Sequence, residues 1–498
     1  MGLSVFDSLL LKEKIMKLKD LLQGIEILRT NVNMDLEITS VAYDSRKATP
    51  GSLFVAITGF VTDGNLYIPM ALEKGAAAVV TAVQPHEDIP YILVGSDRLA
   101  LAQLGANFYG HPAKAMTLVG ITGTNGKTTS TLLLKHILEV TRNAKVGLLG
   151  TMDNMIGDIS VPATRTTPES LDLQELFAKM RDAGCSHVIM EVSSHAIALE
   201  RVGGVHFDVA AFTNLTEDHL DFHETMENYC DTKAELFARS EKCVANRDDA
   251  WFQRICAKTT APVLTTSVKG DGDLQAKDLQ LLADGISFTA VCGEEQVEVC
   301  LPIPGKFTVY NTLTVLGCAM QLGISLKEAA CALKTAKGVK GRVEVVPTEG
   351  RPYTILIDYA HTPDGLENVL SAVRGFCRGR LISVFGCGGD RDPIKRPIMG
   401  KIGVELSDIA IITSDNPRRE APMDIIRDIL AGIDPNCKNY KVIENRPSAI
   451  HHAMDIAEKD DIIVLAGKGH ETYQEIQGVK HHLDEREVVA KYLEETRG

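Results

Sequence analysis

Closely spaced cysteines are missing from this sequence. The eleven cysteines are scattered, and the nearest two, Cys292 and Cys300, are eight residues apart, so the chain has no C-x-x-C pair for a metal or a redox-active disulfide. Scattered thiols, odd in number, are typical of proteins that work in a reducing compartment. We therefore expect a cytoplasmic protein.

The chain also lacks long apolar runs and an excess of basic residues. No run of about 18 apolar residues occurs, and lysines interrupt the apolar residues of 8–23, which predicts an amphipathic helix there and neither a signal sequence nor a membrane span. The 66 acidic and 52 basic residues give a net charge of −14, which argues against non-specific nucleic-acid binding. We expect a soluble monomer with neither nucleic-acid nor membrane partners.

The chain shows no short-period repeat and no low-complexity segment. Its 498 residues are enough for roughly three domains at about 150 residues each. His111-Pro112 and Gly341-Arg342 interrupt the pattern, so we predict domains at 1–111, 112–340 and 341–498. The fold class that we expect is α/β, with a small N-terminal α/β domain, a central domain with a mostly parallel sheet, and a Rossmann-like C-terminal domain.

The periodicity of the apolar residues supports this class. In the central domain, apolar strands at 116–122, 145–150, 187–192 and 209–213 alternate with helices, as in a parallel sheet covered by helices on both faces. A more polar section, roughly 261–302, predicts an antiparallel excursion. In the third domain, the strands at 353–358, 380–385, 408–413 and 461–466 are apolar throughout, as strands buried on both faces should be.

The segment MTLVGITGTNGKTTS, 116–130, predicts a phosphate-binding loop between a strand and a helix. Gly123 and Gly126 allow a tight turn that exposes backbone N–H groups, and the helix N-terminus adds a partial positive charge. Lys127 can reach the β- and γ-phosphates, and the Thr128 hydroxyl can ligate Mg²⁺. The strict G-x-x-x-x-G-K-[ST] spacing fails at Ile121. We interpret the loop as an ATP site formed by Gly123, Thr124, Asn125, Gly126, Lys127, Thr128 and Thr129.

The loops after the four C-terminal strands predict a second ligand site. They read YAHTPD, GCGGDRD, SDNPRRE and GKGHE, and all are rich in glycine, charge or histidine. In open parallel sheets, ligands bind at the carboxyl ends of the strands. Four ordinary surface loops are the alternative.

Five motifs, in this order, resemble the Mur ligase family, ATP-dependent enzymes that form amide bonds in peptidoglycan synthesis: GTNGKTT (123–129), EVSSH (191–195), TNLTEDHLDFH (213–223), DYAHTPD (358–364) and GCGGDRD (386–392). SDNPR (414–418) resembles the signature of members that add meso-diaminopimelate to UDP-N-acetylmuramoyl-L-alanyl-D-glutamate. The resemblance spans nearly the whole chain. It implies that ATP converts a substrate carboxylate to an acyl phosphate, which the incoming amine then attacks.

The resemblance also implies residue roles in the first two domains. Catalytic roles fall to Lys127, Glu191, His219 and Lys233, and Mg²⁺ would be held by Thr128, Glu191, His219 and Lys233 as a carbamate. The muramoyl-dipeptide would contact Ser45, Thr166, Thr167, Ser193 and Arg201. The sequence departs from the family pattern at Arg165, where relatives carry Asn.

In the third domain, the resemblance implies an amino-acid site and part of the nucleotide site. Diaminopimelate would contact Arg391, Asp415, Asn416, Pro417, Arg418, Gly467 and Glu471, and the nucleotide would also contact Asn311, Arg342 and Asp358. Arg418 offers a bidentate fork for the distal carboxylate, which lysine lacks, and Glu471 would accept hydrogen bonds from the distal ammonium. With lysine bound, an unpartnered Arg418 would cost about 2–5 kcal/mol.

Two other interpretations stay open among enzymes. These are an L-lysine-adding ligase of the same family and a folylpolyglutamate synthetase. Arg418 argues against the first, and the long UDP-domain-like N-terminus argues against the second. A binding or regulatory protein that has lost catalysis would lack some of these residues, yet the six that it would lose first are present: Lys127, Thr128, Glu191, His219, Lys233 and Arg418.

Overall fold

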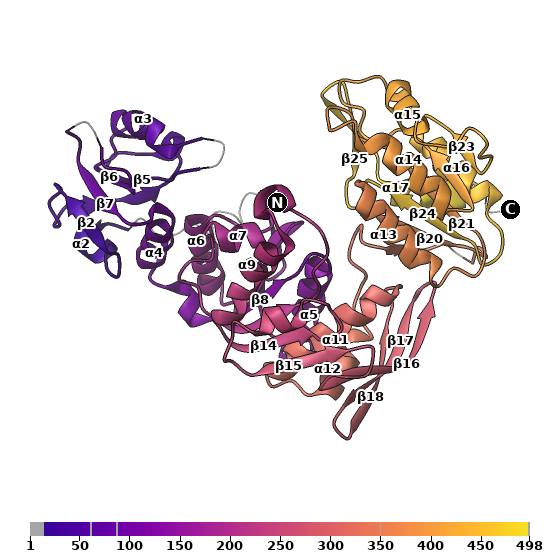
Figure 1. Cartoon of the computed structure of the whole chain (residues 1–498), viewed down its shortest axis with the longest axis horizontal. Helices are drawn as coiled ribbons and strands as arrows, with labels where there is room; N and C mark the ends of the chain where they lie inside the picture. The colour runs from indigo at the N-terminus through magenta and orange to yellow at the C-terminus, as the bar shows by residue number, and fades with distance from the viewer. Residues whose placement is uncertain (1–13, 60–61, 86–87, 349, 497–498) are drawn as a thin grey trace. The chain divides into compact units, whose positions relative to one another are not determined.

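The computed structural model describes residues 14–59, 62–85, 88–348 and 350–496 (Figure 1). These residues form two compact units. The first runs up to Ser267 and also holds Asp271–Leu274 and Thr314–Ala329, and the second holds Val268–Gly270, Gln275–Leu313 and the chain from Ala330 onward. Within the described ranges, no helix is long and apolar enough to cross a membrane. The boundaries of the three domains stay a prediction.

The N-terminal part of the first unit is a five-stranded sheet in the order β2-β7-β6-β5-β4, with β2 antiparallel and the other strands parallel. Its strands are β2 (Ile27–Thr30), β4 (Ser40–Ala42), β5 (Ser52–Ala56), β6 (Ala78–Thr81) and β7 (Tyr91–Val94), and its helices are α3 (Ile68–Glu73), α4 (Asp97–Tyr109) and the 3₁₀ segments η2 (Ser45–Lys47) and η3 (Gly64–Tyr67).

The predicted helix over 8–23 is wrong in its described part. Residues Met16–Lys17 form strand β1, which pairs with β3 (Glu37–Ile38), and only Leu18–Leu21 is helical (α2). Leu18 and Leu21 are fully buried in the N-terminal core. Pairing with a distant strand therefore overrides the local periodicity. Residues 8–13 of the prediction lie outside the described residues.

The central sheet of the first unit has the order β11-β10-β9-β12-β8-β13-β14-β15. All neighbours from β9 to β15 pair in parallel, and β10 and β11 form an antiparallel hairpin at one edge. The strands are β8 (Thr117–Thr122), β9 (Val146–Leu149), β10 (Asp153–Ile156), β11 (Ile159–Pro162), β12 (His187–Glu191), β13 (Phe207–Phe212), β14 (Ser240–Asn246) and β15 (Val263–Ser267). The predicted parallel sheet is confirmed.

Helices cover both faces of this sheet (Figure 1). Helices α6 and α9 share one core with the alternate strand residues Leu118, Val188 and Met190. On α11, a Cβ at Gly317 would lie 2.8 Å from Val244, which points to the opposite face from its neighbour Cys243 in that core. The helices here are η4 (Pro112–Ala115), α5 (Lys127–Arg142), α6 (Ser170–Asp182), α7 (Ser194–Ala198), α8 (Leu220–His223), α9 (Met226–Ala238), α10 (Phe252–Cys256), α11 (Lys306–Gln321) and α12 (Leu326–Leu333). Residues 306–313 of α11 and 330–333 of α12 belong to the second unit.

The antiparallel excursion predicted over 261–302 is confirmed only in part. Strands β17 (Gly285–Cys292) and β18 (Glu295–Leu301) pair antiparallel and follow β16 (Leu274–Leu282). β15, however, pairs in parallel with β14, so the antiparallel part begins only after β15. Its residues Thr266 and Ser267 are buried, so the polar composition of this strand concealed its place in the sheet.

The second unit contains a six-stranded sheet in the order β19-β20-β24-β21-β22-β23, parallel except for β19. Two apolar cores, one on each face, enclose it. Its strands are β19 (Glu344–Val346), β20 (Thr354–Asp358), β21 (Leu381–Phe385), β22 (Ile409–Ile412), β23 (Tyr440–Val442) and β24 (Ile462–Ala466), with the hairpin β25 (Tyr473–Ile476) and β26 (Val479–His482). Its helices are α13 (Pro363–Arg374), α14 (Lys395–Leu406), α15 (Pro422–Leu430), α16 (Arg446–Ile456) and α17 (Glu485–Glu495).

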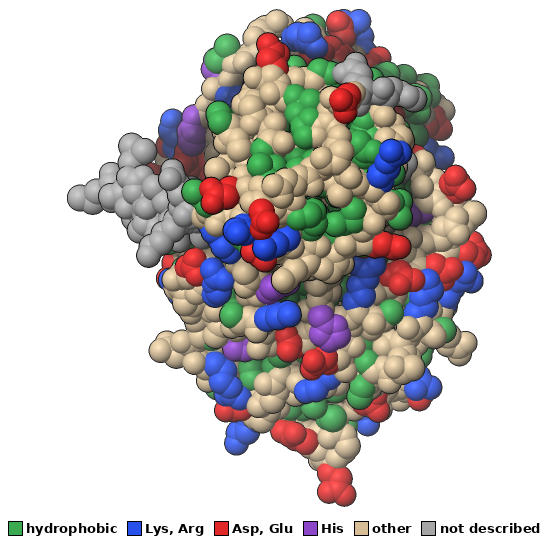
Figure 2. Space-filling view, turned by 90° about the vertical axis from the view of Figure 1, so that its left-hand side faces the viewer, with side chains coloured by type: hydrophobic (Ala, Val, Ile, Leu, Met, Phe, Trp, Pro, Cys, Tyr) green, Lys and Arg blue, Asp and Glu red, His purple; other side chains and the backbone are tan. Residues whose placement is uncertain are grey.

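The surface agrees with the charge balance of the sequence. Figure 2 shows acidic and basic side chains interspersed over one face of the molecule, with apolar side chains between them.

Candidate active site

The predicted phosphate loop lies between β8 and α5, as expected. Gly123 has φ +147° and Gly126 has φ +86°, values that L side chains rarely adopt. A Cβ at Gly123 would lie 1.9 Å from the Thr213 hydroxyl oxygen, so only glycine lets the loop pass. Thr213 Oγ1 in turn donates a hydrogen bond to Asn125 O at 2.7 Å. The loop is thus held open at the N-terminus of a sixteen-residue helix, where backbone N–H groups favour an anion.

Glu191 connects this loop to the end of β12. Its carboxylate is almost fully buried and accepts hydrogen bonds from the Thr128 hydroxyl (2.9 Å) and from the backbone N–H and the hydroxyl of Thr151 (3.0 Å each). Thr151 also bonds Thr166 at 3.0 Å, and Thr167 donates to Glu191 O at 2.8 Å. The structure therefore brings together Thr128, Glu191, Thr166 and Thr167, which lie in three separate segments of the sequence.

Two lysines meet beneath the loop. Lys127 donates to Gly123 O and Thr124 O at 2.8 Å, and Lys233 on α9 donates to the same Gly123 O at 3.0 Å. The Lys233 Nζ also lies 4.5 Å from the centre of the Tyr229 ring. Burial, and next the nearby charge of Lys127, holds the pKa of Lys233 well below its ordinary value. Lys233 is therefore a buried lysine, although it lies on a helix.

His219 is the N-cap residue just before helix α8 and has a left-handed conformation, with φ +55°. Its ring packs edge-on against His195, with ring centres 4.8 Å apart, and lies 3.4 Å from Asp218 Oδ1 through Nδ1. His223 bonds Ser194 at 2.9 Å, and burial lowers the pKa of His223 to about 4. The histidines therefore gather between α7 and α9, at the side of the loop that holds Lys233.

The predicted contacts of the muramoyl-dipeptide fall in two places. Thr166, Thr167, Ser193 and Arg201 lie together near Glu191: Ser193 N donates to Thr167 Oγ1 at 3.2 Å, and Arg201 Nη1 donates to Thr167 O at 3.5 Å. Ser45 lies in the N-terminal sheet domain, where its hydroxyl contacts Met70 Sδ at 3.3 Å. No hydrogen bond among the described residues joins Ser45 to the other four.

Glu169 gathers three guanidinium groups that the sequence did not single out as a cluster. Its Oε2 lies 3.4 Å from Arg201, 3.5 Å from Arg165 and 3.8 Å from Arg98. Three cations around one carboxylate leave a net positive charge beside the threonines. Arg165, the departure from the family pattern, is part of this cluster.

In the second unit, the four polar loops meet at one edge of the sheet, as predicted. Their strands β20, β24, β21 and β22 are neighbours and run parallel, so their carboxyl ends share that edge. Gly389 N donates to Asn416 O at 2.9 Å, and the Asn416 side chain donates to Glu471 at 2.9 Å. The rings of Tyr359 and His470 lie 4.9 Å apart. The residues predicted to bind the amino-acid substrate are therefore close neighbours.

Close backbone approach shapes this edge. A Cβ at Gly467 (φ +117°) would lie 2.6 Å from Asp415 Oδ2, and one at Gly389 would lie 2.0 Å from Pro417 O. Arg391 packs beside Gly388 together with Arg418, whose Nη1 donates to Gly389 O at 2.8 Å. The glycines of GCGGDRD and GKGHE let these loops pack against the loop 414–418.

Three buried charged residues at this edge were missed by the sequence analysis. Lys468, with no exposed surface, donates to Asn416 Oδ1 and Glu471 Oε2 at 3.1 Å each. Arg446 is likewise enclosed and donates to Glu485 Oε1 at 2.8 Å. Lys468 belongs to the loop GKGHE, which the sequence analysis had already assigned to the ligand site, so its position between two predicted ligands could have been suspected. Arg446 and Glu485 are 39 residues apart, and no local sequence pattern indicates that they form an ion pair.

In the second unit, the residues predicted to contact the nucleotide include Asp358, at the end of β20, and Arg342, just before β19. Asp358 at the end of β20 accepts from the backbone N–H groups of Val343 and Ala360 at 2.9 Å, and burial raises its pKa. The Arg342 guanidinium lies 5.5 Å from the centre of the Tyr359 ring. Asn311 is buried on α11. The described hydrogen bonds do not link Asn311 to Arg342 or Asp358, so their common role stays a prediction.

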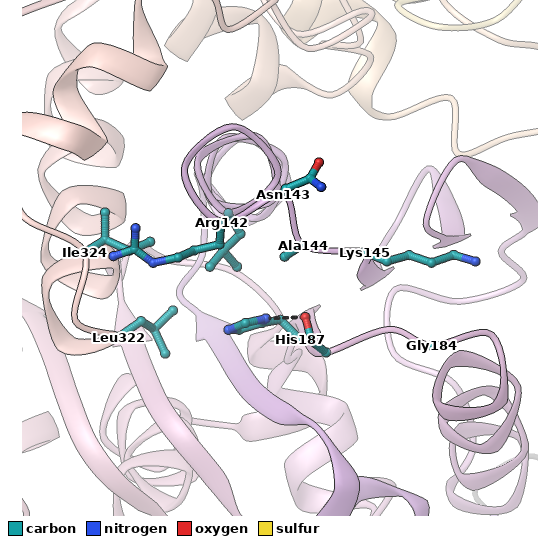
Figure 3. A pocket seen from close by; sticks show the side chains of 10 residues that line it. Arg142, Asn143, Ala144, Lys145, Gly184, His187, Leu322 and Ile324 are labelled. Atoms are coloured by element: carbon teal, nitrogen blue, oxygen red, sulfur yellow. Dashed lines mark hydrogen bonds between the residues drawn. The ribbon is translucent and has the colours of Figure 1, made fainter.

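A pocket of about 440 Å³ lies within the first unit, away from the phosphate loop (Figure 3). Arg142, Lys145, His187 and Leu322 are among its lining residues, and Lys145 points away from Arg142. His187 begins β12, whereas Glu191 ends it. The pocket is therefore at the amino ends of the strands, opposite the phosphate loop.

The metal ligands stay a prediction. In the described part of the chain, no group of three or more His, Cys, Asp or Glu side chains is arranged to hold a metal ion. The proposed set depends instead on a hydroxyl (Thr128) and on a chemically modified lysine (Lys233). Thr128 and Glu191 already bring hard oxygen donors within 2.9 Å of each other, the donor type that Mg²⁺ prefers.

Three segments of the chain match sequence models of known domain families. They are "Mur ligase family, catalytic domain" at residues 37–109, "Mur ligase middle domain" at 121–319 and "Mur ligase, glutamate ligase domain" at 341–469. The chain belongs to the Mur ligase family. The resemblance and the expected ligase class are therefore confirmed.

Similar proteins agree with this membership. A protein of Clostridium botulinum named UDP-N-acetylmuramoyl-L-alanyl-D-glutamate–2,6-diaminopimelate ligase is 48% identical over 465 residues, 92% of this chain and 96% of its own. A protein of the same name from Caldanaerobacter subterraneus is 48% identical over 485 residues, 97% of this chain and 100% of its own. A solved structure of a ligase of this name has a TM-score of 0.73 at 30% identity, covering 97% of this chain and 100% of its own.

Proposed function

We propose that this Mur ligase adds meso-2,6-diaminopimelate to the D-glutamate of UDP-N-acetylmuramoyl-L-alanyl-D-glutamate, with ATP as co-substrate, in the cytoplasm. The observation that carries the proposal is that relatives 48% identical over more than nine-tenths of the chain bear this name. The loop 414–418, with Arg418 among polar neighbours, supports the choice of amino acid.

The phosphate loop supports ATP as the activating substrate. Positioned N–H groups, Lys127 and the N-terminus of α5 would neutralise the phosphates, and phosphoryl transfer depends on such neutralisation more than on covalent help. Thr128 and Glu191, with His219 and a carbamylated Lys233, would hold Mg²⁺. When bound, the ion would supply further positive charge at the phosphates. The transfer would leave an acyl phosphate on the substrate, and the amine would displace phosphate from it.

The lowered pKa of Lys233 supports its modification. Only an unprotonated amine reacts with CO₂, in a step that forms an N–C bond and releases one proton. Burial beside Lys127 keeps the pKa of Lys233 low and thus favours the unprotonated form. The charge of the resulting carbamate would offset that of Lys127.

Phosphate release tests the proposal. The protein would be given ATP, Mg²⁺ and UDP-N-acetylmuramoyl-L-alanyl-D-glutamate, with meso-diaminopimelate or L-lysine, and separately a folate with L-glutamate. We expect release that depends on both the nucleotide substrate and meso-diaminopimelate. Fastest release with lysine would favour the lysine-adding ligase, release only with folate a folylpolyglutamate synthetase, and none with any pair a binding protein.

A further inference from the structure

The hairpin of β25 and β26 is attached to the loop that holds Arg418. Arg418 N donates to Glu475 O at 3.0 Å, Gln477 N donates to Arg418 O at 2.7 Å, and the two segments form a parallel bridge at Ile476. Glu475 N donates to Asn416 Oδ1 at 2.9 Å. The backbone of Glu475 is therefore fixed on both sides against two predicted ligands of diaminopimelate.

The side chain of Glu475 faces the predicted carboxylate fork. Glu475 Oε2 lies 3.3 Å from Arg418 Nε, and both side chains are partly exposed, 26% and 19%. Arg418 adopts φ +51° and its Nη1 donates to Gly389 O, so the direction of its guanidinium is set. These contacts use the Nε side and one Nη1 hydrogen of a group that carries five N–H donors.

Glu471 has a different charge environment from Glu475. Glu471 Oε2 accepts from Asn416 Nδ2 at 2.9 Å and from the buried Lys468 at 3.1 Å. The charge of Glu471 is therefore offset by a lysine within the protein. Glu475 has its ion-pair partner in Arg418, at the more exposed side of the same loop. The edge thus presents a cation and an anion next to each other.

We propose that Glu475 is a further specificity-determining residue, which binds the distal ammonium of diaminopimelate while Arg418 binds the distal carboxylate. The distal end of this amino acid is a zwitterion, and a neighbouring cation and anion complement it. The proposal rests on the proposed function, since it concerns the same amino acid. It adds Glu475 as a second carboxylate beside Glu471, which the family resemblance implies for the same ammonium.

A competing role predicts the opposite effect. Glu475 could stand in for the ligand carboxylate on Arg418 and so compete with the amino acid. In that case removal of its charge would lower the KM for meso-diaminopimelate. A purely structural role would change the use of every amino-acid substrate alike.

The test compares Glu475→Gln with wild type on two substrates, meso-diaminopimelate and 2-aminopimelate, which lacks the distal amino group. We expect the KM for meso-diaminopimelate to rise about tenfold, as loss of a charge-assisted hydrogen bond predicts. We expect kcat, the KM for ATP and the KM for 2-aminopimelate to stay within about twofold. Glu475→Asp keeps the charge on a shorter side chain, so its KM for meso-diaminopimelate should lie between those of wild type and Glu475→Gln.

Glu458→Gln is the matched control. Glu458 Oε1 also lies 3.3 Å from an arginine, Arg380, but outside the four loops, and its side chain is 76% exposed. We expect wild-type kinetics from this variant. An unchanged or lower KM for meso-diaminopimelate in Glu475→Gln, or an equal rise with 2-aminopimelate, would overturn the proposal. If Glu475→Gln fails to fold, the KM values for meso-diaminopimelate and 2-aminopimelate are compared in Glu475→Asp instead. Wild type that does not use meso-diaminopimelate would instead contradict the proposed function.

Discussion

The Thr128 hydroxyl donates a hydrogen bond of 2.9 Å to Glu191 Oε1, which joins the N-terminus of α5 to the carboxyl end of β12. A Cβ at Gly150 would lie 2.5 Å from the same oxygen, so a glycine makes room for this carboxylate. With Thr151 as a second donor residue, both oxygens of a buried anion are satisfied by hydrogen bonds. The arrangement keeps a negative charge in place next to the phosphate loop.

Glu191→Gln should therefore affect Mg²⁺ more than folding. The amide has the same shape but no charge, so we expect the Mg²⁺ concentration for half-maximal phosphate release to rise at least about tenfold, the effect of lost metal ligation. The free energy of unfolding should change by about 1–2 kcal/mol. Mg²⁺ titration and urea denaturation measure the two quantities. The exposed Glu241→Gln serves as the control, and an unchanged Mg²⁺ requirement in Glu191→Gln would contradict the assignment.

Lys127→Met should lower activity without unfolding the protein. The lysine contacts two loop carbonyls, so its removal takes away a cation that phosphoryl transfer needs. We expect kcat to fall on the order of 10²–10³-fold, as for the loss of one transition-state donor. Steady-state kinetics and circular dichroism check this outcome. Lys114→Met, at an exposed lysine, should behave as wild type, and a loss of less than about threefold in Lys127→Met would argue against a phosphate role.

Gly467→Ala should damage the amino-acid site. The substituted residue would be strained at φ +117° and its Cβ would meet Asp415 Oδ2, so we expect about 1–3 kcal/mol of destabilisation and a higher KM for the amino acid. Gly270→Ala is the matched control, because Gly270 has φ +100° but no atom within 4 Å of the added Cβ. Equal thermal shifts in the two variants would show that backbone strain alone, without the Asp415 contact, explains the effect.

His223 should make stability depend on pH in the acid range. Burial lowers its pKa from 6.5 to about 4, so the unfolded chain binds a proton that the folded chain refuses between these values. The free energy of unfolding should therefore fall as the pH drops from about 6.5 to about 4. His223→Gln keeps a partner for Ser194 and should flatten this part of the profile. Denaturation at pH 7, 5.5 and 4.5 measures the slope, and identical slopes would contradict the prediction.

The parts of the fold that follow general rules could be predicted from sequence. The pattern of apolar strands followed by glycine-rich or charged loops predicted that the phosphate loop follows β8. It also predicted that the loops containing Asn416 and Glu471 meet at one edge of a sheet, as they do in the structure. In these segments local pattern and tertiary structure agree. The residue roles carried over from the family stay predictions, because geometry alone does not test them.

The remaining parts depend on long-range pairing that no local pattern records. Lys468 and Arg446 have the composition of solvated surface residues but are fully buried, with their charges offset by Glu471 and by Glu485. A charge of this kind is buried only when a partner is brought to it by the fold. The strand at Met16–Lys17 has the same cause, since pairing with a distant segment replaced the helix that the local periodicity favoured.

Arg418→Ala should weaken the use of meso-diaminopimelate far more than the use of ATP. The expectation that bound lysine leaves Arg418 without a partner needs adjustment, because Gly389 O and Glu475 already contact the guanidinium. Discrimination against lysine should therefore lie toward the lower end of about 2–5 kcal/mol. We expect kcat/KM for meso-diaminopimelate to fall about 10²-fold in Arg418→Ala, with the KM for ATP within about twofold. The neighbouring Arg419, whose side chain is 80% exposed, gives the control Arg419→Ala. Equal losses for the amino acid and for ATP would mean that Arg418 maintains the fold of the loop instead of binding the distal carboxylate.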